Sequence, residues 1–490
     1  MSGIARRETR RRLQLAPDTL FLGIPSGTAA ANVLRTPIFS TLRQLAPDLH
    51  LVVLSPLSRE PHFVEEFSGP RVTLEYLEPH DPGAVERRII RVLQEKYVRR
   101  MPTASMRVRV ARASHAEREV RYLDRLPLEG NVKGLRRAGL TALGSLPVDL
   151  AGWFTLLDLV TLGSRYRELF RRHRPKLVVT PTSGLYFSEG PLLARATRAG
   201  VPTMAIDLSW DHFTTKTAPL RPVSRMCVWN EPMRDEAMRL HGYRFEQVAV
   251  TGVPQFDQYA DRAALGSRAE FLESIGMPST ARLVTVTTVP PVLYPGHDEV
   301  VDHLLRARRD GLLGKDVRLL VRVHQRDELD RYQRFEGVAG LRVEKPFRHT
   351  IVAEGSSVDP STADRRHLAR TLLHSDVVVN VASTIAIEAA ILDTQIVNIG
   401  FDLPTPKPYL DSAARFYDYT HYRPLVTGGA VAVAHSPGDM VGQVRAALEH
   451  PERRREERAA VARLLAYRID GGASRRIAEE IVTTLRSGTF

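Results

Sequence analysis

A serine–threonine pair, Ser383 and Thr384, stands between a run of valines and a helical pattern. The valine run, residues 377–379, is typical of a parallel strand that is covered on both faces. A helix that begins at this pair would offer free N–H groups and the positive end of its dipole, which can hold a phosphate. Glu388 follows one turn later, too late for a capping box, and a ribose or sugar hydroxyl suits it as a partner. The alternative is an ordinary helix cap followed by a solvated glutamate.

Arg322 and His324 stand two residues apart at the end of a predicted strand, so both would lie on the same face. Arginine matches the geometry of phosphate oxygens, and histidine can add a hydrogen bond or a charge. Thr287 and Thr288 end a second predicted strand, where a hydroxyl-rich loop can meet a nucleotide diphosphate. The alternatives are a strand end in solvent for the first pair and an ordinary β-branched strand for the second.

A loop after another predicted strand, residues 207–216, contains Trp210, Asp211, His212 and Lys216. An acid, an imidazole and a lysine just past a strand end are typical of a catalytic loop. In that interpretation Asp211 or His212 takes a proton from a substrate. The alternative is a surface loop that Trp210 anchors.

The turn of Ser26, Gly27 and Thr28 joins the first predicted strand to a helix. Its small residues allow a substrate to approach closely, or simply allow a tight turn. The turn is not a P-loop, because no Gly-Lys-Ser/Thr follows, and it lacks the dinucleotide-binding fingerprint.

The composition indicates a globular chain of two or three domains, with 490 residues and a hydrophobic fraction of 43%. A single cysteine, Cys227, excludes an intramolecular disulfide framework and fits a reducing cytoplasm. The basic start, residues 1–12, is not followed by the long apolar core of a secretory signal.

The formal net charge is +13, and arginines are clustered along the chain. Such clusters can bind nucleic acid, anionic lipid or anionic substrates, although an arginine-rich composition would also raise the count. We expect no nucleic-acid partner, because no zinc finger or RNA-binding aromatic motif is present. The apolar stretch 139–162 is interrupted by Pro147, Asp149 and Asp158, which favours a buried helix pair over a membrane-surface segment or a span. The clustered arginines are Arg6 to Arg12, Arg99, Arg100, Arg107, Arg109, Arg112, Arg118, Arg121 and Arg453 to Arg455.

Alternating strand and helix patterns predict two Rossmann-like, doubly wound α/β domains that face each other across a cleft. We expect the first domain at 17–255 with a helical basic insert at about 83–172, the second at 256–470, and a C-terminal helix at 471–490. The predicted strands are 19–24, 49–54, 72–76, 176–180, 202–206, 226–229, 247–251, 282–287, 317–323, 341–344, 377–379 and 395–399.

Five segments follow one another along the chain: 209–216, 228–231, 250–257, 322–324 and the pair 383–384 with Glu388. In this order they resemble the GT-B glycosyltransferase superfamily, with bacterial surface-polysaccharide transferases and the CDP-glycerol glycerophosphotransferase group as the nearest relatives. Two departures are Gln325, where Arg-x-His is commonly followed by Pro, and Asp211-His212, where Asp-Asn is expected.

The resemblance implies a metal-independent transfer of a sugar, or a polyol phosphate, from a nucleotide-activated donor to a glycan or lipid-linked acceptor of the cell envelope. It implies no cofactor, and a cytoplasmic enzyme at the inner face of the plasma membrane. A nucleotide-sugar 2-epimerase of the same architecture and a non-catalytic polysaccharide- or membrane-binding protein are the alternatives. Asp211 and His212 would be catalytic; the donor would contact Thr287, Thr288, Arg322, His324, Ser383, Thr384 and Glu388; the acceptor would contact Ser26, Gly27, Thr28 and Lys216.

Overall fold

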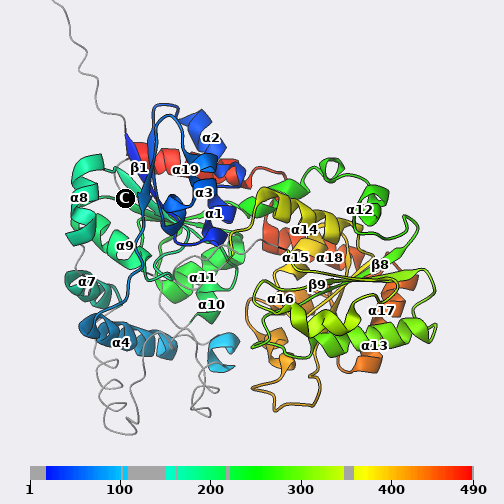
Figure 1. The fold of residues 1–490 in the computed structure, drawn as a ribbon. Helices are drawn as coiled ribbons and strands as arrows, with labels where there is room; N and C mark the ends of the chain where they lie inside the picture. Colours follow the sequence, from blue (N-terminus) through cyan, green and yellow to red (C-terminus); the bar gives the residue numbers. More distant parts are fainter. Residues whose placement is uncertain are drawn as a thin grey trace, which may run out of the picture.

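Two parallel α/β sheets lie side by side in the computed structural model and form the cores of two domains (Figure 1). This confirms the predicted fold class of two Rossmann-like domains. The structure describes residues 18–100, 103–108, 150–161, 164–216, 221–346 and 358–487. Half of the apolar stretch 139–162 lies outside these ranges, as do the arginine cluster 6–12, Arg109, Arg112, Arg118 and Arg121.

Within the described residues the first sheet has seven parallel strands in the order β3-β2-β1-β4-β5-β6-β7. Its central strands are buried runs of Leu, Val and Ile, as a sheet covered by helices on both faces requires. The strands are β1 Thr19–Gly23, β2 His50–Ser55, β3 Val72–Tyr76, β4 Leu177–Thr180, β5 Thr203–Ile206, β6 Arg225–Val228 and β7 Val248–Val250. The helices are α1 Gly27–Val33, α2 Pro37–Leu45, α3 Pro61–Phe67, α4 Ala84–Arg100, α7 Leu150–Val160, α8 Ser164–His173, α9 Glu189–Arg198, α10 His212–Thr215 and α11 Glu231–His241.

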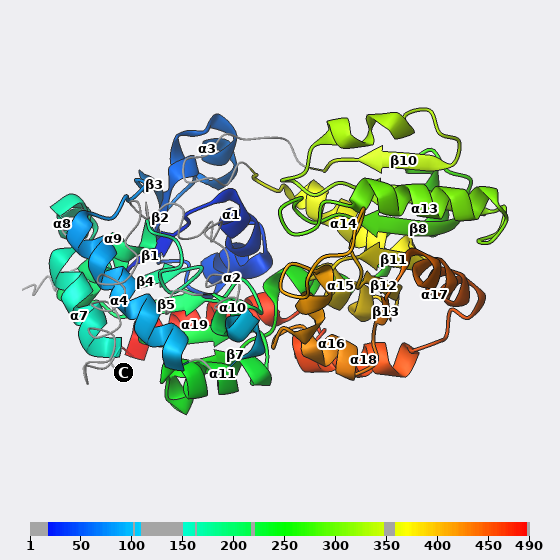
Figure 2. The same cartoon turned by 90° about the horizontal axis from the view of Figure 1, so that it is seen from below.

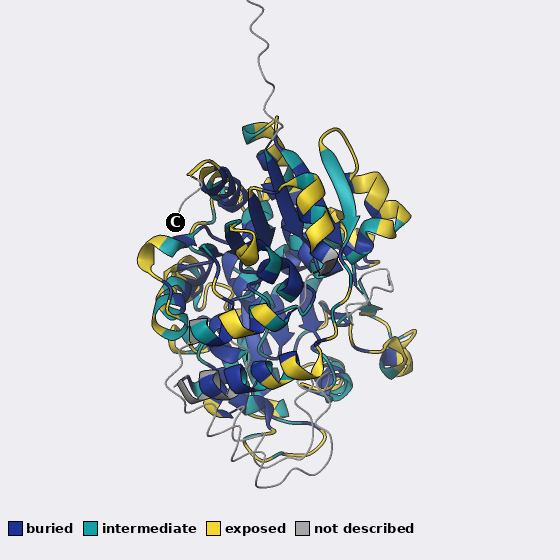
Figure 3. Ribbon diagram, turned by 90° about the vertical axis from the view of Figure 1, so that its left-hand side faces the viewer, coloured by how far each residue is buried: buried dark blue, intermediate teal, exposed yellow. Residues whose placement is uncertain are grey.

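The second sheet, counted over the described residues, has six parallel strands in the order β10-β9-β8-β11-β12-β13. Both sheets are completely buried at their centres, whereas the outer helix faces are exposed (Figure 3). The strands are β8 Arg282–Thr287, β9 Val317–Arg322, β10 Leu341–Glu344, β11 Val377–Asn380, β12 Gln395–Ile399 and β13 Ala432–Ala434. The helices are α12 Arg268–Ser274, α13 His297–Arg309, α14 Thr362–His374, α15 Ile385–Ile391, α16 Arg423–Thr427, α17 Pro437–Glu449, α18 Arg455–Ala466 and α19 Ala473–Ser487.

Helix α19 crosses back from the second domain and packs on α2 of the first (Figure 1). Ile477, Ile481 and Leu485 are buried in the same apolar cluster as Leu42. Asp257, in the connection between the sheets, accepts hydrogen bonds from the backbone N–H groups of residues 473 and 474 at 2.9 and 2.8 Å. These bonds satisfy free N–H groups at the start of α19. They also join the segment by which the chain enters the second domain to the segment by which it returns to the first.

The helical insert contains α4 and α7, which pack against each other through a small buried cluster that includes Trp153 and Phe154. Across the residues that the structure describes, no helix has the length and apolar character needed to cross a membrane. In Figure 2, α1 of the first domain lies next to α14 of the second. The side chain of Arg365 on α14 donates a 2.8 Å hydrogen bond to the carbonyl oxygen of Ala31 on α1, which joins the domains on that side.

Candidate functional site

A row of polar residues crosses the second sheet at the carboxyl ends of its strands. The row consists of neighbours in register on five strands: Glu344 on β10, Arg322 on β9, Thr287 on β8, Asn380 on β11 and Asn398 on β12. Neighbours in register on parallel strands point to the same face, so the five side chains form one continuous row. Ligands of open α/β sheets bind at this end of the strands.

Arg322 has a partner within the domain. Its side chain is 5% exposed, and its Nη1 donates a 2.8 Å hydrogen bond to Glu344 Oε1. The same carboxylate lies 2.9 Å from His367 Nε2 on α14. Burial lowers the pKa of Arg322, and Glu344 opposes that shift. Glu344 was not singled out from the sequence, although its place at the end of a predicted neighbouring strand was a usable signal.

Glu388 also has a partner, which comes from the connection between the domains. The hydroxyl of Tyr259, in the 3₁₀ segment Pro254–Tyr259, donates a hydrogen bond to Glu388 Oε2. Burial raises the pKa of Glu388 to about 7, although Tyr259, Arg322 and Arg365 favour its ionised form. The carboxylate is therefore not a free capping or surface group, and it lies close to the guanidinium of Arg322.

His324 lies two residues beyond the end of β9, which ends at Arg322, and Val321 and Val323 pack in one apolar cluster as the predicted alternation requires. Its backbone N–H donates a 2.7 Å hydrogen bond to Thr288 Oγ1, and its Nδ1 accepts a 3.0 Å bond from the N–H of Arg326. Burial lowers the pKa of His324 to about 4. At neutral pH the ring is therefore uncharged and can contribute a hydrogen bond, not a charge.

The pair Ser383 and Thr384 does precede a helix, since α15 begins at Ile385. The backbone N–H of Ile385 donates a 3.3 Å hydrogen bond to Ser383 Oγ, and Thr384 makes no side-chain cap. The strand that leads to this turn ends in Asn380, whose side chain is completely buried.

Two of the buried polar side chains in the row have no hydrogen-bond partner among the described residues. They are the amide of Asn380, at both its oxygen and its nitrogen, and the hydroxyl of Thr287. Buried polar groups in folded proteins are nearly always hydrogen-bonded. These side chains therefore mark the strand ends as a place where a polar ligand can bind. Asn380 was missed from the sequence because it looked like the last residue of an ordinary strand.

The loop of the first domain holds an aspartate–histidine pair. His212 Nδ1 lies 2.7 Å from Asp207 Oδ1, and both side chains are largely buried. The backbone N–H of Ser209 donates a 2.9 Å hydrogen bond to the same carboxylate oxygen, which fixes the position of Asp207. The contact is one of charge and proximity, because its angles do not make a hydrogen bond and Nδ1 has no hydrogen-bond partner among the described residues. Nε2 is the other ring nitrogen that can accept a proton. Asp207 was not assigned a role from the sequence, although it begins the loop.

Asp211 is engaged differently from its neighbour. Its carboxylate accepts a 2.6 Å hydrogen bond from Ser209 Oγ and lies 3.0 Å from Lys216 Nζ. Burial alone would raise the pKa of Asp211, but Lys216, His212 and His421 outweigh it and hold that pKa well below its ordinary value. A carboxylate in this setting is a weak base. Lys216, predicted to contact the acceptor, compensates the charge of Asp211.

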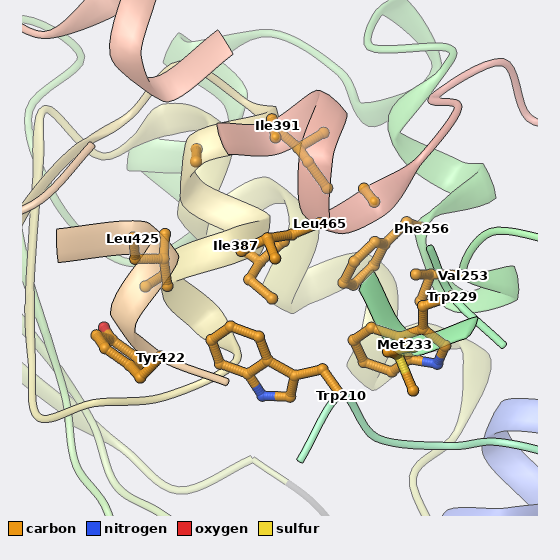
Figure 4. Packing of buried hydrophobic residues seen from close by; sticks show 14 of the residues in the cluster. Trp210, Trp229, Met233, Val253, Phe256, Ile387, Ile391, Tyr422, Leu425 and Leu465 are labelled. Carbon is orange, nitrogen blue, oxygen red and sulfur yellow. The ribbon is translucent and has the colours of Figure 1, made fainter. Parts of the chain in front are cut away.

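Trp210 packs this loop against the second domain. Its ring lies 4.9 Å from that of His421 and 5.6 Å from that of Tyr422, centroid to centroid. Figure 4 shows Trp210 between Tyr422 and Trp229 in an apolar cluster that contains side chains from both domains. The Tyr422 hydroxyl in turn accepts a 2.5 Å hydrogen bond from Asn398 Nδ2, so the loop is linked to the row of strand ends.

The turn of Ser26, Gly27 and Thr28 has structural roles at its first two positions. Ser26 Oγ accepts a 3.2 Å hydrogen bond from the N–H of Ala29 and so caps α1. A Cβ atom at Gly27 would lie 2.6 Å from Cα of Asp359 in the second domain. The close approach that Gly27 allows is therefore that of the other domain. Thr28 is half-buried.

In the part of the chain that the structure covers, no group of three or more His, Cys, Asp or Glu residues could hold a metal ion. No protein-family model and no curated protein matches the sequence.

Several solved structures resemble this chain over nearly its whole length. A UDP-GlcNAc 2-epimerase from Neisseria meningitidis bound to UDP-GlcNAc is 10% identical with a TM-score of 0.55, and covers 95% of this chain and 100% of its own. A putative UDP-N-acetylglucosamine 2-epimerase from Listeria monocytogenes is 12% identical with a TM-score of 0.52, and the match covers 96% of this chain and 98% of the epimerase. S. aureus MnaA, in a co-structure with UDP, is 13% identical with a TM-score of 0.51, and the match covers 96% of this chain and 97% of MnaA. The chain therefore has the GT-B-like fold of two Rossmann-like domains.

Proposed function

We propose that the protein is a GT-B type glycosyltransferase that moves a sugar, or a polyol phosphate, from a nucleotide-activated donor to an acceptor of the cell envelope. One observation carries the proposal. The loop with the Asp207–His212 pair packs, through Trp210 and Tyr422, against the second domain beside its row of polar strand ends. A base on one domain and phosphate-binding groups on the other are the two parts that such a transfer needs.

The second domain would bind the donor. Arg322 and the turn at Ser383 and Thr384 would hold the phosphates and stabilise the negative charge of the departing nucleotide without a metal ion. Thr287, Thr288 and the uncharged ring of His324 would add hydrogen bonds, together with Asn380. Glu388 would exchange the hydroxyl of Tyr259 for a hydroxyl of the donor.

The first domain would activate the acceptor. His212 Nε2 takes the proton from the attacking hydroxyl, and Asp207 orients the ring and stabilises the imidazolium that forms. Asp211 remains ionised beside Lys216 and is better suited to positioning than to proton transfer. This assignment prefers His212 over Asp211, which the sequence left open.

A nucleotide-sugar 2-epimerase is the second candidate. The three solved structures with TM-scores of 0.51 to 0.55 support it, since two are described as UDP-GlcNAc 2-epimerases and the third was solved with UDP. Their identity to this chain is 10 to 13%, so the likeness supports the fold more strongly than the reaction.

Incubation of the protein with UDP-sugars, followed by NMR, separates the candidates. An epimerase inverts the configuration of the sugar without an acceptor. A transferase leaves the sugar unchanged until an envelope glycan or lipid-linked acceptor is added, and then releases the nucleotide. His212→Ala should strongly slow the transfer, because it removes the proposed base. If no nucleotide or nucleotide sugar binds at all, the proposal is wrong and a non-catalytic binding protein is the better description.

A further inference from the structure

A basic cavity of about 520 Å³ lies at the junction of the two domains. Three arginines converge on it from three separate elements: Arg107 follows α4 in the helical turn 104–108, Arg239 lies on α11, and Arg423 begins α16. Thr103 and Thr420 add hydroxyl groups to the wall. The volume is within the usual range for small-molecule sites.

The lining favours a ligand with more than one negative charge. The described residues that line the cavity include three guanidinium groups and no carboxylate. The carboxyl group of Glu236 on α11 interacts with Arg239, but burial raises the pKa of Glu236 to about 8, so it compensates little of the positive charge at neutral pH. All three arginine residues are exposed, which leaves their N–H donors accessible from the cavity. Guanidinium groups bind phosphate oxygens through paired, charge-assisted hydrogen bonds.

Hydrogen bonds connect the wall of the cavity to the loop that carries His212. Thr103 Oγ1 donates a 2.9 Å bond to the carbonyl oxygen of Thr214, which lies in the short helix α10 that begins at His212. On the other side, the backbone N–H of Ala104 donates a 3.2 Å bond to Thr420 Oγ1. The cavity therefore lies between the loop of the first domain that carries His212 and the segment before α16 of the second domain.

We propose that this cavity is the subsite for the phosphate or diphosphate group of the acceptor. The inference rests on the proposed function and adds to it that the acceptor is phosphorylated. An anionic group bound by Arg107, Arg239 and Arg423 lies beside α10, so the remainder of the acceptor is within reach of the loop that would deprotonate it.

Calorimetry with inorganic pyrophosphate tests the subsite without any assay of turnover. The variant R107Q/R423Q removes one arginine of the cavity from each domain. A matched control, R43Q/R445Q, removes one exposed arginine from each domain elsewhere. The variant loses the charge-assisted hydrogen bonds of two arginines, so R107Q/R423Q should weaken pyrophosphate binding by at least about tenfold, and the control should not. Equal affinity in all three proteins, or no binding to the wild type, would overturn the proposal.

Binding of UDP distinguishes a failed subsite from a failed function. R107Q/R423Q should bind UDP as the wild type does, whereas R322A should lose UDP and keep pyrophosphate. If R322A loses pyrophosphate and R107Q/R423Q does not, the anion site is the donor site and the cavity has no such role. If no nucleotide or nucleotide sugar binds but pyrophosphate binds at the cavity, the cavity is an anion site, but the proposed function fails and the acceptor role fails with it.

A final comparison identifies the source of the phosphate. Vesicles that contain phosphatidate should compete with pyrophosphate for the wild-type cavity if the acceptor is a lipid phosphate. Competition by a soluble sugar phosphate, but not by the vesicles, assigns a soluble acceptor. Failure of both to compete would contradict an acceptor role.

Discussion

Replacing Glu388 by glutamine should make the stability of the protein depend less on pH. The carboxyl group lies beside Tyr259, Arg322 and Arg365 at the junction of the domains, where burial raises its pKa from 4.5 to about 7. Glutamine keeps the size of the side chain and can still accept the hydrogen bond of Tyr259 through its amide oxygen. It cannot ionise, so the variant removes the titration and little else.

The magnitude follows from the two pKa values. One pKa unit corresponds to about 1.4 kcal/mol, so the ionisation of Glu388 costs the folded protein about 3 kcal/mol. Between about pH 4.5 and about pH 7 the folded state binds more protons at this site than the unfolded state does. The free energy of unfolding contributed by Glu388 therefore falls as the pH rises through that window. Below it, Glu388 is protonated in both states and the penalty is absent.

Urea unfolding of the wild type and of Glu388→Gln, at several pH values between about 5 and about 8, measures the effect. The variant should gain roughly 3 kcal/mol over the wild type as the pH rises. Glu479→Gln, an exposed glutamate paired with Arg475, is the control and should show no such trend. Tyr259→Phe removes the donor that favours the ionised form, so the transition should move to higher pH. A constant difference between the wild type and Glu388→Gln would refute the buried environment of this carboxyl group.

Two further predictions concern the first domain. His212→Ala and Asp207→Asn should each lower turnover by roughly a hundred- to ten-thousand-fold without a change in UDP affinity; a loss of UDP affinity instead would place the pair at the donor. Gly27→Val should destabilise the contact between the domains by about 1–3 kcal/mol, because the added side chain meets the backbone at Asp359. Thermal unfolding checks this against Thr28→Val, and equal midpoints would contradict the close packing.

Local patterns predicted most strands to within one or two residues, because β-branched runs bounded by turns are a strong signal. The strand Ala432–Ala434 was missed, since its three residues include a single β-branched one. Residues 30–45 have the pattern of one helix but belong to two helices, α1 and α2. Thr36 precedes Pro37 and is extended, at φ −96° and ψ 165°, as the residue before a proline is constrained to be.

A residue of the candidate site could be predicted only where its position follows from the strand to which it belongs. Arg322 and Thr287 end their strands as expected, because strand ends are encoded locally. The partner of Glu388 is not encoded locally, because Tyr259 is 129 residues away in the sequence and meets Glu388 only in the folded protein. The sequence shows which residues can ionise, but the packing of distant elements decides which of them are neutralised.

The two proposed anion sites differ in a way that suits different tasks. Arg322 is buried and its charge is already compensated by Glu344. The binding free energy that a donor phosphate gains from Arg322 is therefore only the difference between the contact with the phosphate and the contact with Glu344. Small differences in the donor then decide whether binding is favourable, which makes this site selective. The arginines of the interdomain cavity are exposed and uncompensated within its described wall. Their field extends into solvent and attracts anions of many shapes, so this site favours fast capture. Selection of the donor would therefore be the task of the second domain, and capture of a phosphorylated acceptor that of the junction.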